Sequence, residues 1–263
     1  MGKCKKNFLY INSNFGLVHK IKTLFIFFDI LVFFDFFLKL KTTLFLNNFL
    51  NVIHGVPRIH FLAENARTAR AFLKEVGHPR PLQSLQIVQI GHAPEAAAVD
   101  DWLQPLAAGH DLAVVAEAGC PGVADPGALI AARAHARGFA VRPLVGPSAI
   151  LLALMAGGGN GQRFRFVGYL PQDSAERILR LRELEAAARS GETQLFIETP
   201  YRNERLFDAL LATCAPATRL SVAVALTAPD EFIATRSIAQ WRSAARPMLT
   251  KRPAVFSLLP PQR

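Results

Sequence analysis

The chain lacks the residues and motifs that would indicate a metal site, a disulfide framework or a common phosphate-binding loop. Its 263 residues include only three cysteines, Cys4, Cys120 and Cys214, with no CxxC pair and no nearby histidine pattern. Neither disulfides nor a zinc site is therefore expected. The phosphate loops GxGxxG and GxxxxGK[ST] are absent, as are GxSxG and HExxH. We expect a protein without a metal, in the reducing cytoplasm.

The first fifty residues also lack whole classes of residue. They contain no Ala, Arg, Pro or Glu, yet hold eleven of the 20 Phe and seven of the nine Lys, whereas the rest of the chain is rich in Ala and Arg. Such a switch in composition indicates a boundary near residue 51. We interpret residues 1–51 as an atypical Phe- and Lys-rich segment, either not native to the domain or a membrane tether.

The apolar stretch at residues 23–40 is a weak candidate for a membrane span. It is short, and Asp29 and Asp35 would each cost about 2.5 to 3.5 kcal/mol near the centre of a bilayer. A signal peptide is not favoured either, because the apolar run begins late and no small-residue cleavage site follows it. A membrane partner is therefore unfavoured, but residues 23–40 leave it open.

The formal net charge of +10 is unevenly distributed. Half of the excess lies in the first fifty residues, which carry seven Lys against two Asp. The modest positive balance of the remainder is compatible with RNA binding and equally with ordinary solubility.

From residue 52 onward, segments with the patterns of strands and helices alternate. Residues 58–65 read as a strand and residues 66–77 as a helix stopped by glycine and proline. This alternation is typical of an α/β fold with a mainly parallel sheet. The triple glycine after Met155 suggests a boundary between an N-terminal α/β lobe, 52–157, and a C-terminal α/β lobe, 158–263.

A glycine-rich loop follows one of the expected strands. Residues 94–109 predict a helix and residues 111–118 a strand, after which EAGCPGVADPG at 117–127 is too rich in turn residues to be helical. Ligands in open α/β sheets gather beyond the carboxyl ends of strands, where glycines let the backbone approach a ligand. The alternative is a plain tight connection.

The ordered set of motifs resembles a known family. EAGCPGVADPG, then VRPLVGPSAILLALMAGG, FVGYLP and FIETPYR are similar to the motifs of the tetrapyrrole methylase superfamily, the class III S-adenosylmethionine methyltransferases. Their order is most similar to the bacterial 16S rRNA cytidine 2′-O-methyltransferase branch, and the similarity covers residues 58–259. The resemblance implies a two-lobed α/β enzyme, usually a homodimer, with S-adenosylmethionine in a cleft between the lobes and rRNA or the small ribosomal subunit as partner.

The resemblance also implies site residues. The residues that match the cofactor-binding positions of the family are Gly119, Cys120, Pro121, Val123, Asp125, Gly127, Ser148, Ala149, Leu170 and Ala223. The substrate-binding candidates are Arg67, His92, Tyr201 and Arg202, since Arg grips phosphate and Tyr stacks on bases.

A ribose hydroxyl must lose a proton during methylation, so a carboxylate near the cleft is expected. Glu198 and Glu64 are the candidates. Other readings stay open, because Glu198 and Arg202 are spaced to form a simple i, i+4 ion pair and His92 could be an ordinary loop histidine.

The chain departs from the family in several respects. Asn65 replaces the Asp of the family's EDTR motif, and in KRPAVFSLL at 251–259 Arg252 and Pro253 replace a Gly and a Glu. The first strand of the family and its proline-glycine loop have no counterpart in the sequence pattern, and their loss would remove a core strand of the first lobe. Two other functions therefore remain: a methyltransferase acting on a tetrapyrrole or another small molecule, and an inactive truncated protein of the same fold that only binds.

Overall fold

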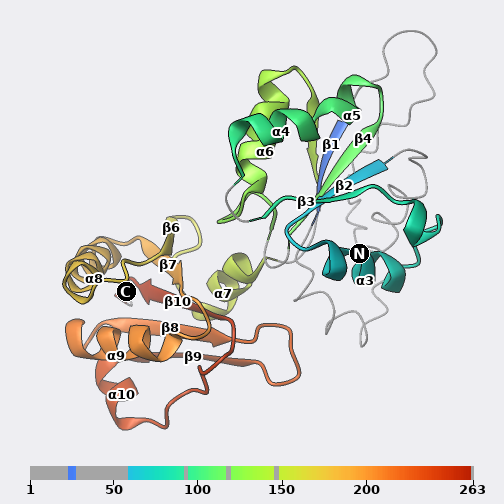
Figure 1. Ribbon diagram of the computed structural model, residues 1–263. Helices are drawn as coiled ribbons and strands as arrows, with labels where there is room; N and C mark the ends of the chain where they lie inside the picture. The colour runs from blue at the N-terminus through green and yellow to red at the C-terminus, as the bar shows by residue number, and fades with distance from the viewer. Residues whose placement is uncertain (1–22, 28–58, 92–93, 117–119, 145–147, 262–263) are drawn as a thin grey trace, which may run out of the picture.

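The chain folds into two α/β lobes, each built on one five-stranded sheet (Figure 1). This architecture confirms the fold expected from the sequence. The structure, a computed structural model, describes residues 23–27, 59–91, 94–116, 120–144 and 148–261.

The first sheet is entirely parallel, with the order β3-β2-β4-β1-β5. Its strands are β1 (Thr23–Phe27), β2 (Ile59–Ala63), β3 (Ile87–Gln89), β4 (Asp111–Val115) and β5 (Ala140–Pro143). Strand β4 lies in the middle and is buried over its last four residues. Near-continuous apolar strands of this kind are typical of parallel sheets covered on both faces.

Strand β1 bears on two expectations from the sequence. It lies between β4 and β5, where Phe25 pairs in register with Ala113 on one side and Arg142 on the other. Residues 23–27, within the segment interpreted as atypical, thus supply a strand of the first sheet. The unusual amino-acid composition of residues 1–51 did not reveal this strand. Pairing between strands requires only an extended backbone, which many residue types can adopt.

The helices of the first lobe pack on this sheet around a core of apolar side chains. They are α3 (Ala66–Glu75), α4 (Ala96–Trp102), α5 (Gln104–Ala107) and α6 (Gly127–Ala136), with a short 3₁₀ turn, η1 (Leu82–Ser84). Leu62, Val114 and Ile130 are almost fully buried in that core. The single helix expected over 94–109 is divided at Leu103, because Pro105 has no N–H to continue the hydrogen-bond ladder.

The second sheet is mixed, with the order β6-β7-β10-β8-β9. Its strands are β6 (Phe164–Tyr169), β7 (Thr193–Ile197), β8 (Arg219–Val224), β9 (Phe232–Ser237) and β10 (Ala254–Leu259). Strands β6 and β7 are parallel, and the other neighbours are antiparallel. The sequence pattern did not indicate β9, which lies at the sheet edge and is only half-buried along its whole length.

The helices of the second lobe are α7 (Ala149–Gly157), α8 (Ser174–Arg189), α9 (Asn203–Thr213) and α10 (Ile238–Ser243). Helices α8, α9 and α10 share one core with the sheet, in which Phe207 packs edge-on against Trp241 at a centroid distance of 5.5 Å. The indole N–H of Trp241 donates to the carbonyl of Leu220 at 2.9 Å, so the ring is both buried and satisfied.

Helix α7 covers the opposite face of the second sheet. Its Ala153 packs with Ala223 of β8 and Val255 of β10 in a separate cluster, and in Figure 1 α7 lies on the side of that sheet that faces the first lobe. The boundary expected after residue 157 would therefore separate α7 from the second sheet, on which α7 packs. The packing places α7 with the second lobe.

The triple glycine at 157–159 allows the chain to pack closely where α7 meets the second sheet. A Cβ at Gly159 would lie 2.6 Å from Thr193 Oγ1. The carbonyl of Gly157 accepts a hydrogen bond from Thr235 Oγ1 at 2.8 Å. Glycine is required here because the chain passes directly against the sheet.

Within the described part of the chain, no helix is long and apolar enough to cross a membrane. Residues 23–27 of the stretch considered as a span belong to strand β1. Residues 28–40 lie outside the described residues.

Candidate active site

The loop between β4 and α6 is stabilised from within by Asp125. Its Oδ1 accepts the backbone N–H groups of Gly122 at 2.5 Å and of Gly127 at 2.8 Å. A short polar side chain that binds nearby N–H groups gives the backbone a turn without help from a helix or a sheet. Asp125, predicted to contact the cofactor, therefore shapes the loop.

Two glycines of this loop are required by its geometry. Gly122 has φ of +89°, a conformation that side chains rarely adopt. A Cβ on Gly127 would lie 2.7 Å from the nitrogen of Gly122 and 3.2 Å from the carbonyl carbon of Pro121. The loop thus folds tightly on itself, and this compactness accounts for its lack of bulky side chains.

The loop lies beside Glu64, which follows β2. Burial raises the pKa of Asp125 above its usual value, the N–H groups of Gly122 and Gly127 oppose that rise, and the negative charge of Glu64 adds to it. Since β2 and β4 are parallel neighbours, their carboxyl ends meet at one edge of the sheet. The structure therefore brings together two residues that the sequence separates by about sixty positions.

The residue after Glu64, Asn65, is the N-cap of helix α3. The side chain of Asn65 accepts the backbone N–H groups of Arg67 at 2.9 Å and of Thr68 at 3.4 Å. Asn and Asp cap helices about equally well. The Asn at this position, which departs from the Asp of the family motif, therefore keeps the cap and places Arg67 in the first turn of α3.

A second group of candidates lies where β7 leads into α9. Glu198 Oε1 accepts Nε and Nη2 of Arg202 at 2.9 and 2.6 Å, and the backbone N–H of Thr199 at 2.6 Å. The i, i+4 ion pair that the spacing left open is thus present. Tyr201, between them in sequence, is 79% exposed.

The turn that carries these residues is held by a distant segment. Asn203 is fully buried, and its Nδ2 donates to the carbonyl of Arg252 at 2.7 Å. The N–H of Lys251 donates to the carbonyl of Pro200 at 3.1 Å. The segment before β10, where the sequence departs from the family motif, therefore fixes the turn after β7, a positioning role that spacing alone could not reveal.

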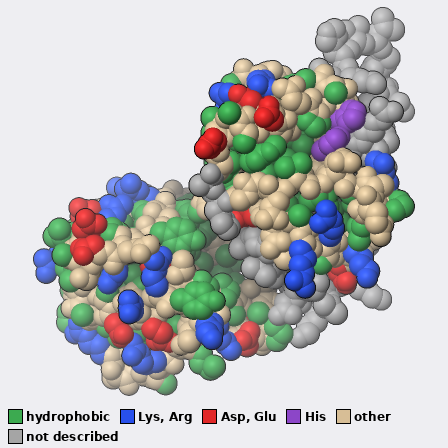
Figure 2. All heavy atoms as spheres, viewed as in Figure 1, with side chains coloured by type: hydrophobic (Ala, Val, Ile, Leu, Met, Phe, Trp, Pro, Cys, Tyr) green, Lys and Arg blue, Asp and Glu red, His purple; other side chains and the backbone are tan. Residues whose placement is uncertain are grey.

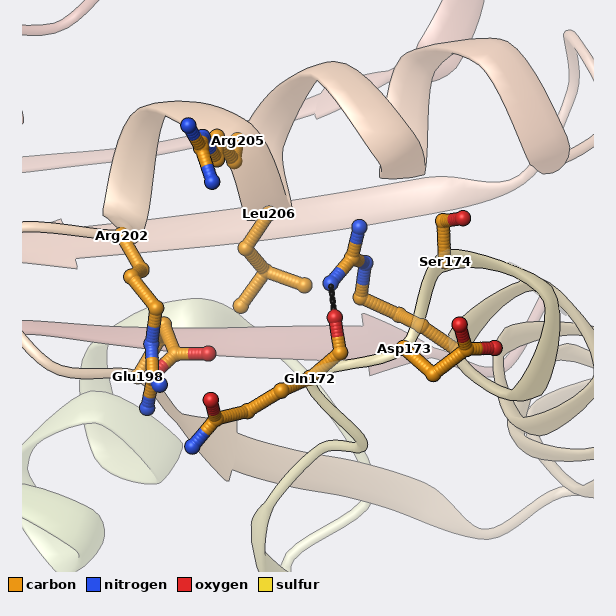
Figure 3. A pocket seen from close by; sticks show the side chains of 8 residues that line it. Gln172, Asp173, Ser174, Glu198, Arg202, Arg205 and Leu206 are labelled. Atoms are coloured by element: carbon orange, nitrogen blue, oxygen red, sulfur yellow. Dashed lines mark hydrogen bonds and ion pairs between the residues drawn. The ribbon is translucent and has the colours of Figure 1, made fainter.

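A cavity of about 360 Å³ opens beside this turn (Figure 3). It lies between the start of α9 and the loop that leads from β6 into α8. Its lining residues are Gln172, Asp173, Ser174, Arg177, Glu198, Arg202, Arg205 and Leu206. Only Glu198 and Arg202 among them were expected from the sequence. The other lining residues come from the loop between β6 and α8, from the start of α8, or from the first turn of α9.

The other predicted residues are dispersed. Leu170 is 4% exposed in the core beneath α8 and α9, and Ala223 is 1% exposed beneath α7, so neither side chain offers a surface to a ligand. Ser148 is the N-cap of α7, with Oγ 3.5 Å from the nitrogen of Leu151, and Ala149 begins that helix.

Two of the remaining residues in the loop after β4 are more accessible. Val123 is 42% exposed, and Cys120 is half-buried. Pro121 is buried. Gly119 and His92 lie outside the described residues.

Comparison with known proteins establishes the family. Residues 50–241 match the model of the tetrapyrrole (corrin/porphyrin) methylases. The chain belongs to this family. The tetrapyrrole methylase fold is also seen in the X-ray structure of a cobalamin biosynthetic enzyme, cobalt precorrin-4 methyltransferase, which superposes with a TM-score of 0.57 at 12% identity over 93% of this chain and 98% of that one.

Two curated relatives share more sequence with the chain. Ribosomal RNA small subunit methyltransferase I of Xylella fastidiosa is 37% identical over 161 residues, 61% of this chain and 55% of the relative. The protein of the same name from Neisseria meningitidis serogroup B is 33% identical over 186 residues, 69% of this chain and 60% of the relative. The matched part thus spans less than two thirds of the length of either relative.

Proposed function

We propose that the chain is an S-adenosylmethionine-dependent methyltransferase that methylates a ribose hydroxyl of small-subunit ribosomal RNA. The observation that carries this proposal is the match of residues 50–241 to the tetrapyrrole methylases together with relatives named rRNA small subunit methyltransferases. The resemblance to the 2′-O-methyltransferase branch supplies the ribose as acceptor. We also propose, on that resemblance alone, a homodimer that acts in the cytoplasm.

The loop after β4 has the features that a nucleoside cofactor requires. It lies at the carboxyl edge of a parallel sheet, it is compact, and it exposes Val123 and part of Cys120 while Asp125 holds its shape. S-adenosylmethionine, when bound, supplies an electrophilic methyl group. Cys120, Pro121 and Val123 would hold it on the first lobe, and Ser148 with Ala149 would hold it at the start of α7.

The two carboxylate candidates have different surroundings. Glu198 Oε1 already accepts three N–H donors and holds the guanidinium of Arg202 in place. Glu64 lies at the edge of the first sheet beside the cofactor loop. We assign Glu64, because it lies beside the cofactor loop, as the proton acceptor, and Glu198 as the residue that positions Arg202. Arg67 and Arg202 then bind the substrate from the two lobes.

The test has two stages. Titration calorimetry with S-adenosylmethionine should show one site per chain, and labelled methyl should then pass to small ribosomal subunits from a strain that lacks the usual enzyme. Binding without labelling of the subunits, together with modification of a porphyrin precursor, would instead establish a small-molecule methyltransferase. Absence of cofactor binding would leave only an inactive protein of this fold.

A further inference from the structure

The cavity beside the β7–α9 turn has a surplus of hydrogen-bond donors. Three of its lining residues are arginines, against two carboxylates. Both carboxylates are engaged: Glu198 holds Arg202, and Asp173 caps α8 by accepting the N–H groups of Ala175 and Glu176, each at 2.9 Å. The backbone N–H of Glu176, followed by the N–H groups of Ala175 and Ser174, lowers the pKa of Asp173 by hydrogen bonding to its carboxylate. Asp173 therefore stays ionised as the cap of α8.

The guanidinium groups, in contrast, retain donors. Arg205 is exposed and forms no hydrogen bond or ion pair with any described residue. Arg177 gives Nη1 to the carbonyl of Gln172 at 3.0 Å, the dashed line in Figure 3, but its Nε is buried and has no partner within the described part of the chain. A buried donor without an acceptor is costly, so an anion that reaches this cavity would be stabilised.

The choice of anion follows from the neighbourhood of the cavity. Tyr201 precedes Arg202 and is 79% exposed. Sites that bind single-stranded nucleic acid combine cationic groups along the backbone with aromatic side chains on which bases stack. In Figure 2 blue basic side chains are spread over the second lobe with red acidic ones among them, so the lobe as a whole is not a basic patch and the cavity is a local feature.

We propose that this cavity binds a phosphodiester of the RNA strand, with Arg205, Arg177 and the free edge of Arg202 around the phosphate and Tyr201 stacked on an adjacent base. The inference rests on the proposed function, from which it takes the RNA. It adds Arg177 and Arg205 to the substrate-binding residues. Both guanidinium groups suit phosphate because their planar donors can pair with two of its oxygens.

The experiment measures how binding of a fluorescein-labelled single-stranded oligocytidylate depends on salt. Each phosphate contact of a single strand contributes about 0.7 to the slope of log K against log salt. The variant Arg205→Gln should reduce the slope by about that amount, while Arg205→Lys, which keeps the charge, should restore most of it. Tyr201→Ala should weaken binding about tenfold with an unchanged slope, because stacking releases no counterions.

The matched control is Arg182→Gln. Arg182 is also an exposed helical arginine of the second lobe without a partner among the described residues, but it lies outside the cavity. Its slope should equal that of the parent chain. An equal loss in both variants would overturn the site, because it would show only a general charge effect, and so would an unchanged slope in Arg205→Gln.

Cofactor binding and methyl transfer, measured on the same preparations, separate this inference from the proposed function. RNA binding whose salt slope is reduced by Arg205→Gln, without methyl transfer, would support the phosphate site and overturn the proposed methyltransferase function. Methyl transfer to RNA with a slope that does not depend on Arg205 would overturn the site alone. A parent chain that does not bind the RNA would overturn the site as well.

Discussion

Glu198 and Arg202 form the most buried ion pair at the candidate site, with Arg202 Nη2 2.6 Å from Glu198 Oε1. The carboxylate side chain is only 3% exposed, whereas the guanidinium is 31% exposed. The pair is therefore asymmetric: Glu198 depends on Arg202 for compensation of its charge, while Arg202 retains access to water and to a ligand.

This asymmetry predicts unequal effects of breaking the pair. Arg202→Met should lower the free energy of unfolding by about 3 kcal/mol, because it leaves a buried carboxylate without its counter-charge. Glu198→Gln should cost less, since it removes the buried charge and keeps an oxygen acceptor for the N–H of Thr199. Urea denaturation measures both.

The control for that comparison is Arg205→Gln, which removes an exposed and unpartnered guanidinium and should change the unfolding free energy by less than about 0.5 kcal/mol. An Arg202 variant as stable as this control would show that the Glu198 carboxylate is not dependent on its partner.

Asp125 predicts a change of stability with pH. Burial and the charge of Glu64 raise its pKa in the folded chain, so the folded state binds the proton more tightly than the unfolded state does. The stabilising contribution of that proton is complete below the unfolded pKa and is lost as the pH rises through the folded pKa. Relative to Asp125→Asn, the parent chain should therefore gain stability as the pH falls from neutral towards about 4, the unfolded pKa of an Asp.

The variant Asp125→Ala isolates the hydrogen bonds from the charge. It should cost about 1 to 3 kcal/mol, because the N–H groups of Gly122 and Gly127 lose their acceptor. Asp125→Asn keeps an acceptor oxygen and should be milder at neutral pH. A parent chain that loses stability relative to Asp125→Asn on acidification would contradict the sign of the pKa shift.

Gly127→Ala should distort the loop after β4. Its Cβ would lie 2.7 Å from the backbone nitrogen of Gly122, which is too close for any side-chain atom. We expect affinity for S-adenosylmethionine in calorimetry to fall at least about tenfold, since loss of a single well-placed polar contact has an effect of that order. Gly161→Ala is the control, because nothing lies within 4 Å of the added Cβ; equal affinities in the two variants would show that the loop does not bind the cofactor.

The sequence predicted those elements whose signals are local. The strand and the helix expected over 58–65 and 66–77 are present at Ile59–Ala63 and Ala66–Glu75, because an apolar run and a stop at glycine are signals that act over a few residues. The pair Glu198 and Arg202 was foreseen as one of two interpretations, since a spacing of four positions can bring two side chains together; in the structure both residues lie in the turn before α9.

The rest depends on contacts between distant segments. Strand β1 can be recognised as a strand only when β4 and β5 are known to pair with it on either side. Helix α7 is apolar on all sides, so its periodicity does not say which sheet it covers. The cavity joins the loop before α8 to the start of α9, and no spacing rule connects Arg177 with Arg205.

The placement of β1 gives a final prediction, which uses the two tryptophans of the chain as separate reporters. Trp102 packs against the core of the first lobe, and Trp241 is buried in the second. Phe25→Pro removes an N–H from β1, an interior strand of the first sheet, and leaves its partner unsatisfied, at about 1 to 3 kcal/mol for each buried group. In a Trp241→Phe background the urea midpoint of the Trp102 fluorescence transition should move to lower urea. In a Trp102→Phe background the midpoint of the Trp241 transition should stay unchanged.

The control is Phe25→Val, which keeps the N–H and a strong strand preference, so it should move the Trp102 transition less. Because the two lobes have separate cores, a shift confined to one reporter is the physical signature of a strand that belongs to the first sheet, and identical curves for Phe25→Pro and the parent chain would place residues 23–27 outside it.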